Sequence, residues 1–186
     1  MQAIDDLFVE EKINGKIYLM SRPDRNHMRV QYNVCKAFND YFKSKNKNCE
    51  ALIEAQFDID KDNYLVPDVM VYCYNTNEDI PVVVVEVLSK STRKRDLTVK
   101  MKKYAEIGVK EYWLVDYKSH SIDIYVLSNS TYEPFESYTF YKPEDFEIIT
   151  NTEAREKLKA EIIKEFSPAF FPEITIQIED IFYFVD

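Results

Sequence analysis

The chain has 186 residues, with 33 acidic and 24 basic side chains and a formal net charge of −9. Hydrophobic residues make up 46% of it, which supports a folded core and excludes an intrinsically disordered chain. The negative charge excludes a surface that coats nucleic acid through basic residues on every side, but it is compatible with a local basic site.

The cysteines and the apolar runs indicate a cellular location. The three cysteines, Cys35, Cys49 and Cys73, form no CxxC pair. An odd number without paired spacing predicts three free thiols in a reducing compartment. The acidic N-terminal stretch lacks the apolar run of a signal peptide, and no run approaches the roughly 20 apolar residues of a membrane span. We therefore expect one cytoplasmic domain over residues 1–186, with no membrane partner.

The first half of the chain predicts a hairpin, a helix and three strands. An Asn-Gly step predicts a hairpin turn within residues 8–20. Apolar residues at helical spacing predict a helix between residues 26 and 45. Turn-forming residues then separate three expected strands, at 49–59, 64–74 and 81–88. The last of these, PVVVVEVL, is so rich in β-branched residues that it is expected to be buried on both faces.

The second half predicts a further helix followed by strands. Asp96 either caps this helix or lies in its first turn, and Gly108 is suited to its C-terminal end. The remaining elements are expected as strands at 111–116 and 122–127, a charged helix at 151–165, and a strand with a short helical turn within 171–184. This order predicts an α/β or α+β fold with a mixed central sheet flanked by helices.

Two carboxylates, Asp68 and Glu86, interrupt apolar strands that follow one another in the chain. Consecutive strands are usually neighbours in space, so the two acids are expected to lie close together. A buried carboxylate is costly, and a divalent cation offsets that cost, since Mg²⁺ is commonly held by one or two carboxylates with water and phosphate. The alternative is that each acid pairs with a buried Arg or Lys, or lies at a solvated strand end.

A basic segment follows Glu86, and a helical wheel separates its lysines. With about 100° per residue, Lys100 lies beside the apolar stripe that contains Leu97 and Tyr104, while Lys102 and Lys103 face solvent. Lys100 is therefore the lysine expected to reach the sheet, where it would orient a water molecule or stabilise charge on a phosphate. The alternative is a solvated helix face with ordinary surface lysines.

Several motifs resemble the Uma2 family, whose members have the restriction-endonuclease-like PD-(D/E)XK fold and are common in bacteria. They are PD at Pro67, EVLS-x-ST from Glu86, D-x-x-x-K-x-x-x-Y from Asp96, and GV-x-EYW-LVD from Gly108. The resemblance covers most of the chain and is weak between residues 129 and 170. One departure from the general nuclease pattern is Leu88, which stands where (D/E)XK would place lysine. In Uma2-like proteins the lysine has moved to the following helix, which corresponds to Lys100.

The resemblance implies a DNA endonuclease that uses Mg²⁺ or Mn²⁺ and hydrolyses phosphodiester bonds through a metal-activated water. Asp68, Glu86 and Lys100 would be catalytic, and the metal ligands would be Asp68, Glu86 and the backbone carbonyl of Val87. DNA is the expected partner, and a homodimer is left open. The residues expected to contact DNA are the basic ones on the following helix: Arg93, Lys94, Arg95 and Lys103.

Two further candidates and two other functions remain open. Glu11 is either an acid in the outer metal shell or an exposed acid of the hairpin, and His27 is either a ligand or an ordinary histidine at a helix start or in the core. The chain is alternatively a binding module without catalysis, which its negative charge favours, because fold does not determine function. A third function is a hydrolase of small phosphorylated substrates or nucleotides, which would need less basic surface.

Overall fold

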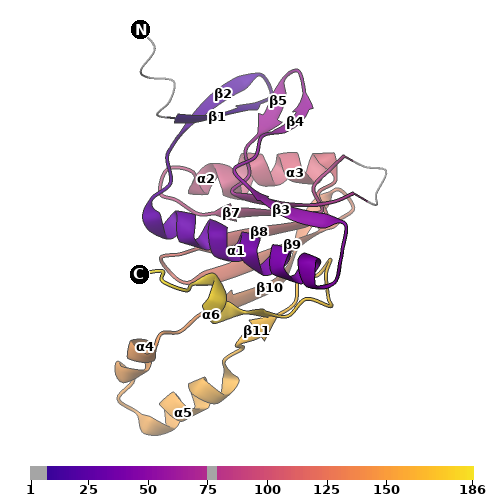
Figure 1. Ribbon diagram of the computed structural model, residues 1–186. Coiled ribbons are helices and arrows are strands. Elements are labelled where there is room, and N and C mark those ends of the chain that lie inside the picture. The colour runs from indigo at the N-terminus through magenta and orange to yellow at the C-terminus, as the bar shows by residue number, and fades with distance from the viewer. Residues whose placement is uncertain (1–7, 75–78) are drawn as a thin grey trace.

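The computed structural model describes residues 8–74 and 79–186, and a six-stranded mixed sheet forms its centre (Figure 1). The strand order is β10-β9-β8-β7-β6-β3, in which β7 and β8 are parallel and the other neighbours are antiparallel. The strands are β3 Cys49–Ile53, β6 Val69–Cys73, β7 Val83–Val87, β8 Glu111–Asp116, β9 Ser121–Ser128 and β10 Thr131–Thr139. The predicted fold class, a mixed sheet flanked by helices, is confirmed.

Helices cover both faces of this sheet. On one face lies α1 (Arg25–Ser44), which buries Val30, Val34, Phe38 and Phe42 against the strands. On the other face lies a continuous helical segment made of α2 (Arg93–Arg95), a π-helical turn (Asp96–Lys100) and α3 (Met101–Ile107). The two apolar cores divide the side chains of β7 between them, because successive residues of a strand point to opposite faces. Glu86 thus shares a face with Val84, on the side of α3.

A second, antiparallel sheet has the order β2-β1-β5-β4. Its strands are β1 Phe8–Ile13, β2 Lys16–Ser21, β4 Phe57–Asp60 and β5 Asn63–Leu65. The predicted hairpin is present as β1 and β2. The strand predicted over 49–59 is instead β3 and β4, which belong to different sheets, and the one predicted over 64–74 is β5 and β6. The break between β5 and β6 falls at Pro67 and Asp68, because proline cannot donate a ladder hydrogen bond.

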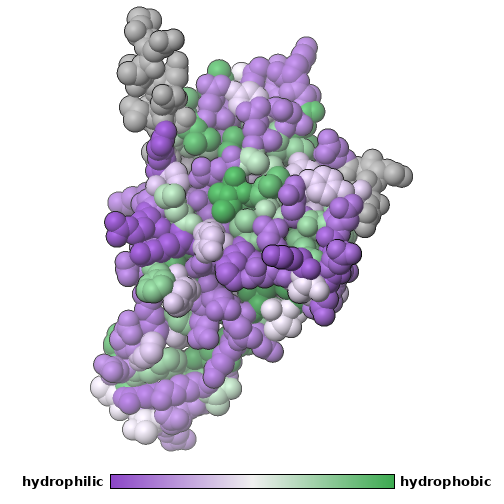
Figure 2. All heavy atoms as spheres, in the orientation of Figure 1, coloured by the Kyte–Doolittle hydropathy of each residue, from purple (hydrophilic) through white to green (hydrophobic). Residues whose placement is uncertain are grey.

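The C-terminal third holds short elements. They are α4 Pro143–Glu147, α5 Thr152–Glu161, β11 Glu165–Phe166, β12 Ile176–Gln177 and α6 Ile178–Ile181. In Figure 1, α4 and α5 lie away from the central sheet, and Figure 2 shows mainly hydrophilic residues on this face of the molecule. The strand β10 was not predicted. No helix within residues 8–74 and 79–186 is long and apolar enough to cross a membrane.

The start of the helical segment differs from the prediction. Asp96 does not cap it, because the helix already begins at Arg93, whose backbone N–H donates to the carbonyl of Ser89. The Ser89 hydroxyl also accepts from the backbone N–H of Thr92. Ser89 therefore accepts from two backbone donors at the start of the segment, and Asp96 lies in its interior.

The prediction of three free thiols is wrong. Cys49 and Cys73 form a disulfide, and only Cys35, which is half-buried, is free among the three. The two bonded cysteines lie directly opposite each other on the antiparallel strands β3 and β6. Their separation of 24 residues gave no sign of this, because the pairing depends on the register of the two strands. The cysteines therefore no longer support a cytoplasmic location.

The disulfide leads to a direct prediction. Thiol titration of the unfolded protein, carried out without reductant, should find one thiol per chain, and the same titration after reduction should find three. A Cys35→Ser variant should then give none without reductant. A count of three before reduction would show that Cys49 and Cys73 are not joined.

Candidate functional site

The register of two strands brings Asp68 and Glu86 together. In the antiparallel pair of β6 and β7, Val71 lies opposite Val83 and Val69 lies opposite Val85. One further step in the same register places Asp68 opposite Glu86, and directly opposed side chains are close neighbours. Asp68 itself lies just before β6, at the break beside Pro67.

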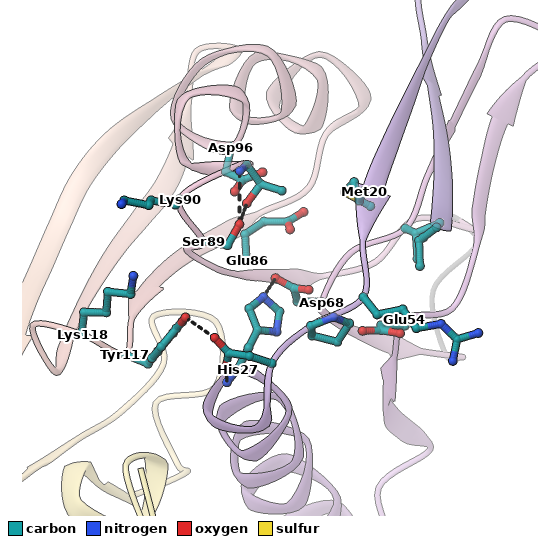
Figure 3. Close-up of a pocket in the computed structure, with 16 residues that line it drawn as sticks. Met20, His27, Glu54, Asp68, Glu86, Ser89, Lys90, Asp96, Tyr117 and Lys118 are labelled. Atoms are coloured by element: carbon teal, nitrogen blue, oxygen red, sulfur yellow. Dashed lines mark hydrogen bonds and ion pairs between the residues drawn. The ribbon is translucent and has the colours of Figure 1, made fainter. Parts of the chain in front are cut away.

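Both carboxylates line one cavity of about 290 Å³, which Figure 3 shows from close by. The cavity lies between the N-terminal end of α1, the end of β7 and the start of the helical segment. Five lining residues are acidic: Asp24, Glu54, Asp68, Glu86 and Asp96. Three are basic: Arg22, Lys90 and Lys118. His27 also lines the cavity. Because acidic residues outnumber basic ones, the cavity carries a surplus of negative charge unless a cation enters.

Asp68 is held by three donors. Its Oδ2 accepts the backbone N–H of Val87 at 2.6 Å, and its Oδ1 accepts the side-chain amide of Gln31 at 2.9 Å. The Nε2 of His27 lies 3.4 Å from Oδ2. Burial lowers the pKa of His27, but hydrogen bonding to Asp68 and to the Val87 backbone, with the charges of Asp68 and Asp24, outweighs burial and raises it. His27, one of the two open candidates, is thus beside Asp68.

Glu54 was missed by the sequence analysis. It follows β3, lines the cavity, and accepts a hydrogen bond at 3.0 Å from the same Gln31 amide that holds Asp68. Its backbone has a φ of 47°, in the left-handed region that residues other than glycine rarely adopt. Such backbone strain is found often at functional sites, which is consistent with a second acid positioned beside Asp68.

Glu86 takes part in a buried cluster of charges. The ammonium group of Lys100 lies 2.6 Å from Oε1 of Glu86 and 2.7 Å from Oε1 of Glu11. The hydroxyl of Tyr104 donates to the same oxygen of Glu86 at 2.8 Å. Glu11 is fully buried and also accepts the backbone N–H of Val66, so the interpretation of Glu11 as an exposed acid of the hairpin is wrong.

One ammonium group is shared between two carboxylates in this cluster. Burial raises the pKa of Glu86 well above its usual value, although Lys100 acts to lower it. Burial lowers the pKa of Lys100, but the charges of Glu86 and Glu11 outweigh burial and hold it above the usual value. Lys100 is 1% exposed and is not among the residues that line the cavity. Lys100 is therefore connected to the cavity through Glu86, which lines it.

The pairing of Glu86 with a buried lysine was the alternative to a metal ligand, and it is present. It does not remove Glu86 from the cavity, because both Lys100 and Tyr104 contact the same oxygen, Oε1, and Glu86 still lines the cavity wall. The ion pair and a ligand role therefore remain compatible for this residue.

Asp96 is a further acid, which the sequence analysis assigned only to a helix cap or to the first turn of the helix. Its side chain is buried and lines the cavity beside Glu86, and neither of its oxygens accepts a hydrogen bond within the described part of the chain. Burial raises the pKa of Asp96 to about 6, although the charge of Lys100 lowers it. A signal existed in the sequence, since Asp96 and Lys100 are four residues apart and lie near each other on a helix.

The residues fit a divalent cation in composition more than in preformed geometry. Within residues 8–74 and 79–186, no three His, Cys, Asp or Glu side chains converge tightly enough to form a metal-binding cluster. Oxygen donors are nevertheless the ligands that Mg²⁺ and Mn²⁺ prefer, and carboxylates outnumber basic groups around the cavity. Asp68, Glu86 and Asp96 are the buried or half-buried acids that line it from both sides.

Most of the basic residues predicted to contact DNA are engaged within the chain. Arg93 pairs with Asp116, and Arg95 lies 3.8 Å from Glu11 and over the ring of Tyr18. Lys103 pairs with Glu106, and its side chain is only 12% exposed, so the wheel was wrong to place it towards solvent. Lys94 is exposed.

Two lysines that were not predicted, Lys90 and Lys118, are exposed and line the cavity (Figure 3).

Comparisons with known proteins identify a family and a similar fold. The family model Uma2, described as "Putative restriction endonuclease", matches residues 4–154. A crystal structure of a "putative nuclease belonging to DUF820" from Anabaena variabilis is similar in fold, with a TM-score of 0.69 and 19% sequence identity. The match covers 96% of this chain and 92% of that one. At that identity it shows the shared fold alone. No curated protein matches the chain significantly.

The buried charge cluster gives a stability prediction. Lys100→Met should lower the free energy of unfolding by about 3–5 kcal/mol, because it leaves Glu11 and Glu86 buried without a cation. Chemical denaturation measures this directly. Lys102→Met, four-fifths exposed on the same helix, is the matched control and should change stability by less than about 0.5 kcal/mol.

A double variant separates charge from packing in the same experiment. Glu11→Gln with Lys100→Met removes one acid together with the lysine, so it should recover part of the stability that Lys100→Met loses. Equal stability of Lys100→Met and the wild type would show that the cluster is not a buried ion pair in solution.

Proposed function

This chain belongs to the Uma2 family, and from that membership and its site we propose that it is a nuclease that hydrolyses phosphodiester bonds of DNA with Mg²⁺ or Mn²⁺. One observation carries the proposal. The strand register sets Asp68 opposite Glu86, at the wall of a cavity that has more acidic than basic groups. The carboxylates of this cavity would repel the phosphates of DNA. A bound metal ion would offset that repulsion.

Asp68, Glu86 and the backbone carbonyl of Val87 would hold the ion. When bound, Mg²⁺ or Mn²⁺ would activate the attacking water and offset negative charge on the phosphate. Contacts within the chain orient the two carboxylates. The Val87 N–H and Gln31 orient Asp68, while Lys100 and Tyr104 orient Glu86 through Oε1. Such supporting contacts set ligand position and basicity in metal sites generally.

Lys100 has a positioning role in this proposal. The sequence analysis expected it to contact water or phosphate, but its ammonium group is enclosed by Glu86 and Glu11 and does not line the cavity. Its charge favours the ionised form of Glu86, which burial and the other carboxylates oppose. We assign to Lys100 the task of keeping Glu86 available as an ionised ligand.

Lys90 and Lys118 are proposed to bind the DNA backbone. Both are exposed and line the cavity, on the segment after β7 and the segment after β8 respectively. They can therefore hold phosphates next to the acidic wall. Of the four basic residues predicted from the sequence, the exposed Lys94 and the half-exposed Arg93 remain as outer contacts, whereas Arg95 and Lys103 are mostly buried against acids.

The activity test uses supercoiled plasmid and a single acid variant. Wild-type protein should nick plasmid with Mg²⁺ or Mn²⁺ and lose that activity with EDTA. Asp68→Asn should reduce the rate at least about 100-fold, because loss of a ligand weakens both metal binding and charge stabilisation. Asp40→Asn, an exposed acid of α1 outside the cavity, is the matched control and should keep full activity.

The same assay distinguishes the other two functions. Hydrolysis of mononucleotides without plasmid nicking would favour the small-substrate hydrolase. DNA binding without any hydrolysis, in wild type and Asp68→Asn alike, would favour a binding module without catalysis. Either result would contradict the nuclease proposal.

The basic contacts have their own test, which needs no catalysis. Lys118→Ala and Lys90→Ala should each weaken binding to duplex DNA and reduce the slope of log affinity against log salt by about 1, because each removes one phosphate contact. Lys102→Ala changes an exposed lysine of α3 that does not line the cavity, so it should leave the slope unchanged. Fluorescence anisotropy across a salt series measures this slope. An unchanged slope in both Lys90→Ala and Lys118→Ala would exclude the two lysines as phosphate contacts.

A further inference from the structure

The helical segment after β7 reverses the usual arrangement of polar and apolar side chains. In its π-helical turn, Asp96–Lys100, the two buried residues are the charged ones at its ends, each 1% exposed. The apolar Leu97 and Val99 are instead 38% and 37% exposed. The wheel had placed Leu97 in the buried stripe, but a π-helical turn has wider spacing than the α-helix that the wheel assumes. Such turns are rare and occur frequently at functional sites.

Asp96 differs from the other fully enclosed acids of the described chain. Glu111 accepts the indole N–H of Trp113 and the backbone N–H groups of Ala169 and Phe170, so its burial is compensated. Glu11 and Glu86 share Lys100. Neither oxygen of Asp96 has a partner with hydrogen-bond geometry within residues 8–74 and 79–186. The Thr92 hydroxyl lies near enough to lower the pKa of Asp96, but it makes its hydrogen bond, at 2.9 Å, with the Ser89 hydroxyl. Buried polar atoms without partners are uncommon in native proteins, and each needs an explanation.

The neighbouring cations are already engaged. Lys100 lies between Glu11 and Glu86, and Arg95 is directed to Glu11 and to the ring of Tyr18. Asp96 instead lines the cavity, next to Glu86 and across from Asp68 (Figure 3). A carboxylate that is enclosed by protein and open to a cavity rich in acids is placed to meet a cation that enters that cavity.

We propose that Asp96 is a third carboxylate ligand for a divalent cation in this cavity, beside Asp68 and Glu86. This assignment rests on the proposed function, because it requires the cavity to bind a metal ion. It gives the π-helical turn a role, since the turn carries Asp96 and Lys100 to the same acidic wall. It also explains why the chain tolerates a buried carboxylate without a donor.

Metal binding rather than catalysis tests the proposal. Isothermal titration calorimetry with Mn²⁺ is carried out on the wild type and on Asp96→Asn, Asp68→Asn and Asp40→Asn. Each variant makes the same exchange of a carboxylate for an amide. Asp96→Asn should weaken Mn²⁺ binding about 10- to 100-fold, as Asp68→Asn does, while Asp40→Asn should not change it. Thermal denaturation gives a second readout: Mn²⁺ should raise the melting temperature of the wild type more than that of Asp96→Asn.

The outcomes separate this inference from the proposed function. If the wild type binds Mn²⁺, Asp68→Asn weakens the binding and Asp96→Asn does not, the metal site stands and Asp96 is not a ligand. If the wild type binds no Mn²⁺, both the metal-dependent function and the ligand role of Asp96 are overturned. Unchanged unfolding of metal-free Asp96→Asn in denaturant is the check that the variant is folded, and Asp96→Ser serves as a second variant if asparagine destabilises the chain.

Discussion

The ion pair of Lys100 with Glu11 and Glu86 is the interaction on which the site depends. It joins the hairpin through β1, the central sheet through β7, and the helical segment on one face of that sheet. Enclosing three charges costs several kcal/mol in desolvation, and only close contacts such as these, at 2.6 and 2.7 Å, offset it. Loss of Lys100 would leave both buried carboxylates without this cation, whereas loss of either acid would leave Lys100 paired with the other.

The second constraint is the interruption of a strand at Pro67. Proline removes a ladder hydrogen bond there, so β5 and β6 enter different sheets and Asp68 is released from regular pairing at the point where they part. The Val87 N–H and the Gln31 amide then hold its two oxygens. Gln31 comes from α1, on the opposite face of the sheet from α3. Helix α1 and the central strand β7 therefore meet at this one carboxylate.

Charge is distributed in a way that suits a metal-assisted reaction better than simple attraction of DNA. The chain is acidic as a whole, its cavity is acidic, and three of the four predicted DNA contacts pair with acids of the same chain, although Arg93 stays half-exposed. Exposed lysines remain at the cavity itself. Asp96 is buried without a hydrogen-bond partner among the described residues, which costs stability, and such a cost is often found where a residue serves function.

The sequence by itself determined the order of the two main helices and of most central strands, the proximity of Asp68 to Glu86, and the inward direction of Lys100, but not β10 or the division of two predicted strands between two sheets. Each rests on a local rule: strand alternation, pairing of consecutive strands, or the helical period. Only the tertiary structure decided that Glu11 is buried, that Cys49 joins Cys73, that Asp96 lines the cavity and that Lys103 is covered. Those facts depend on register between segments distant in sequence and on a π-helical turn, and neither is encoded in a local period.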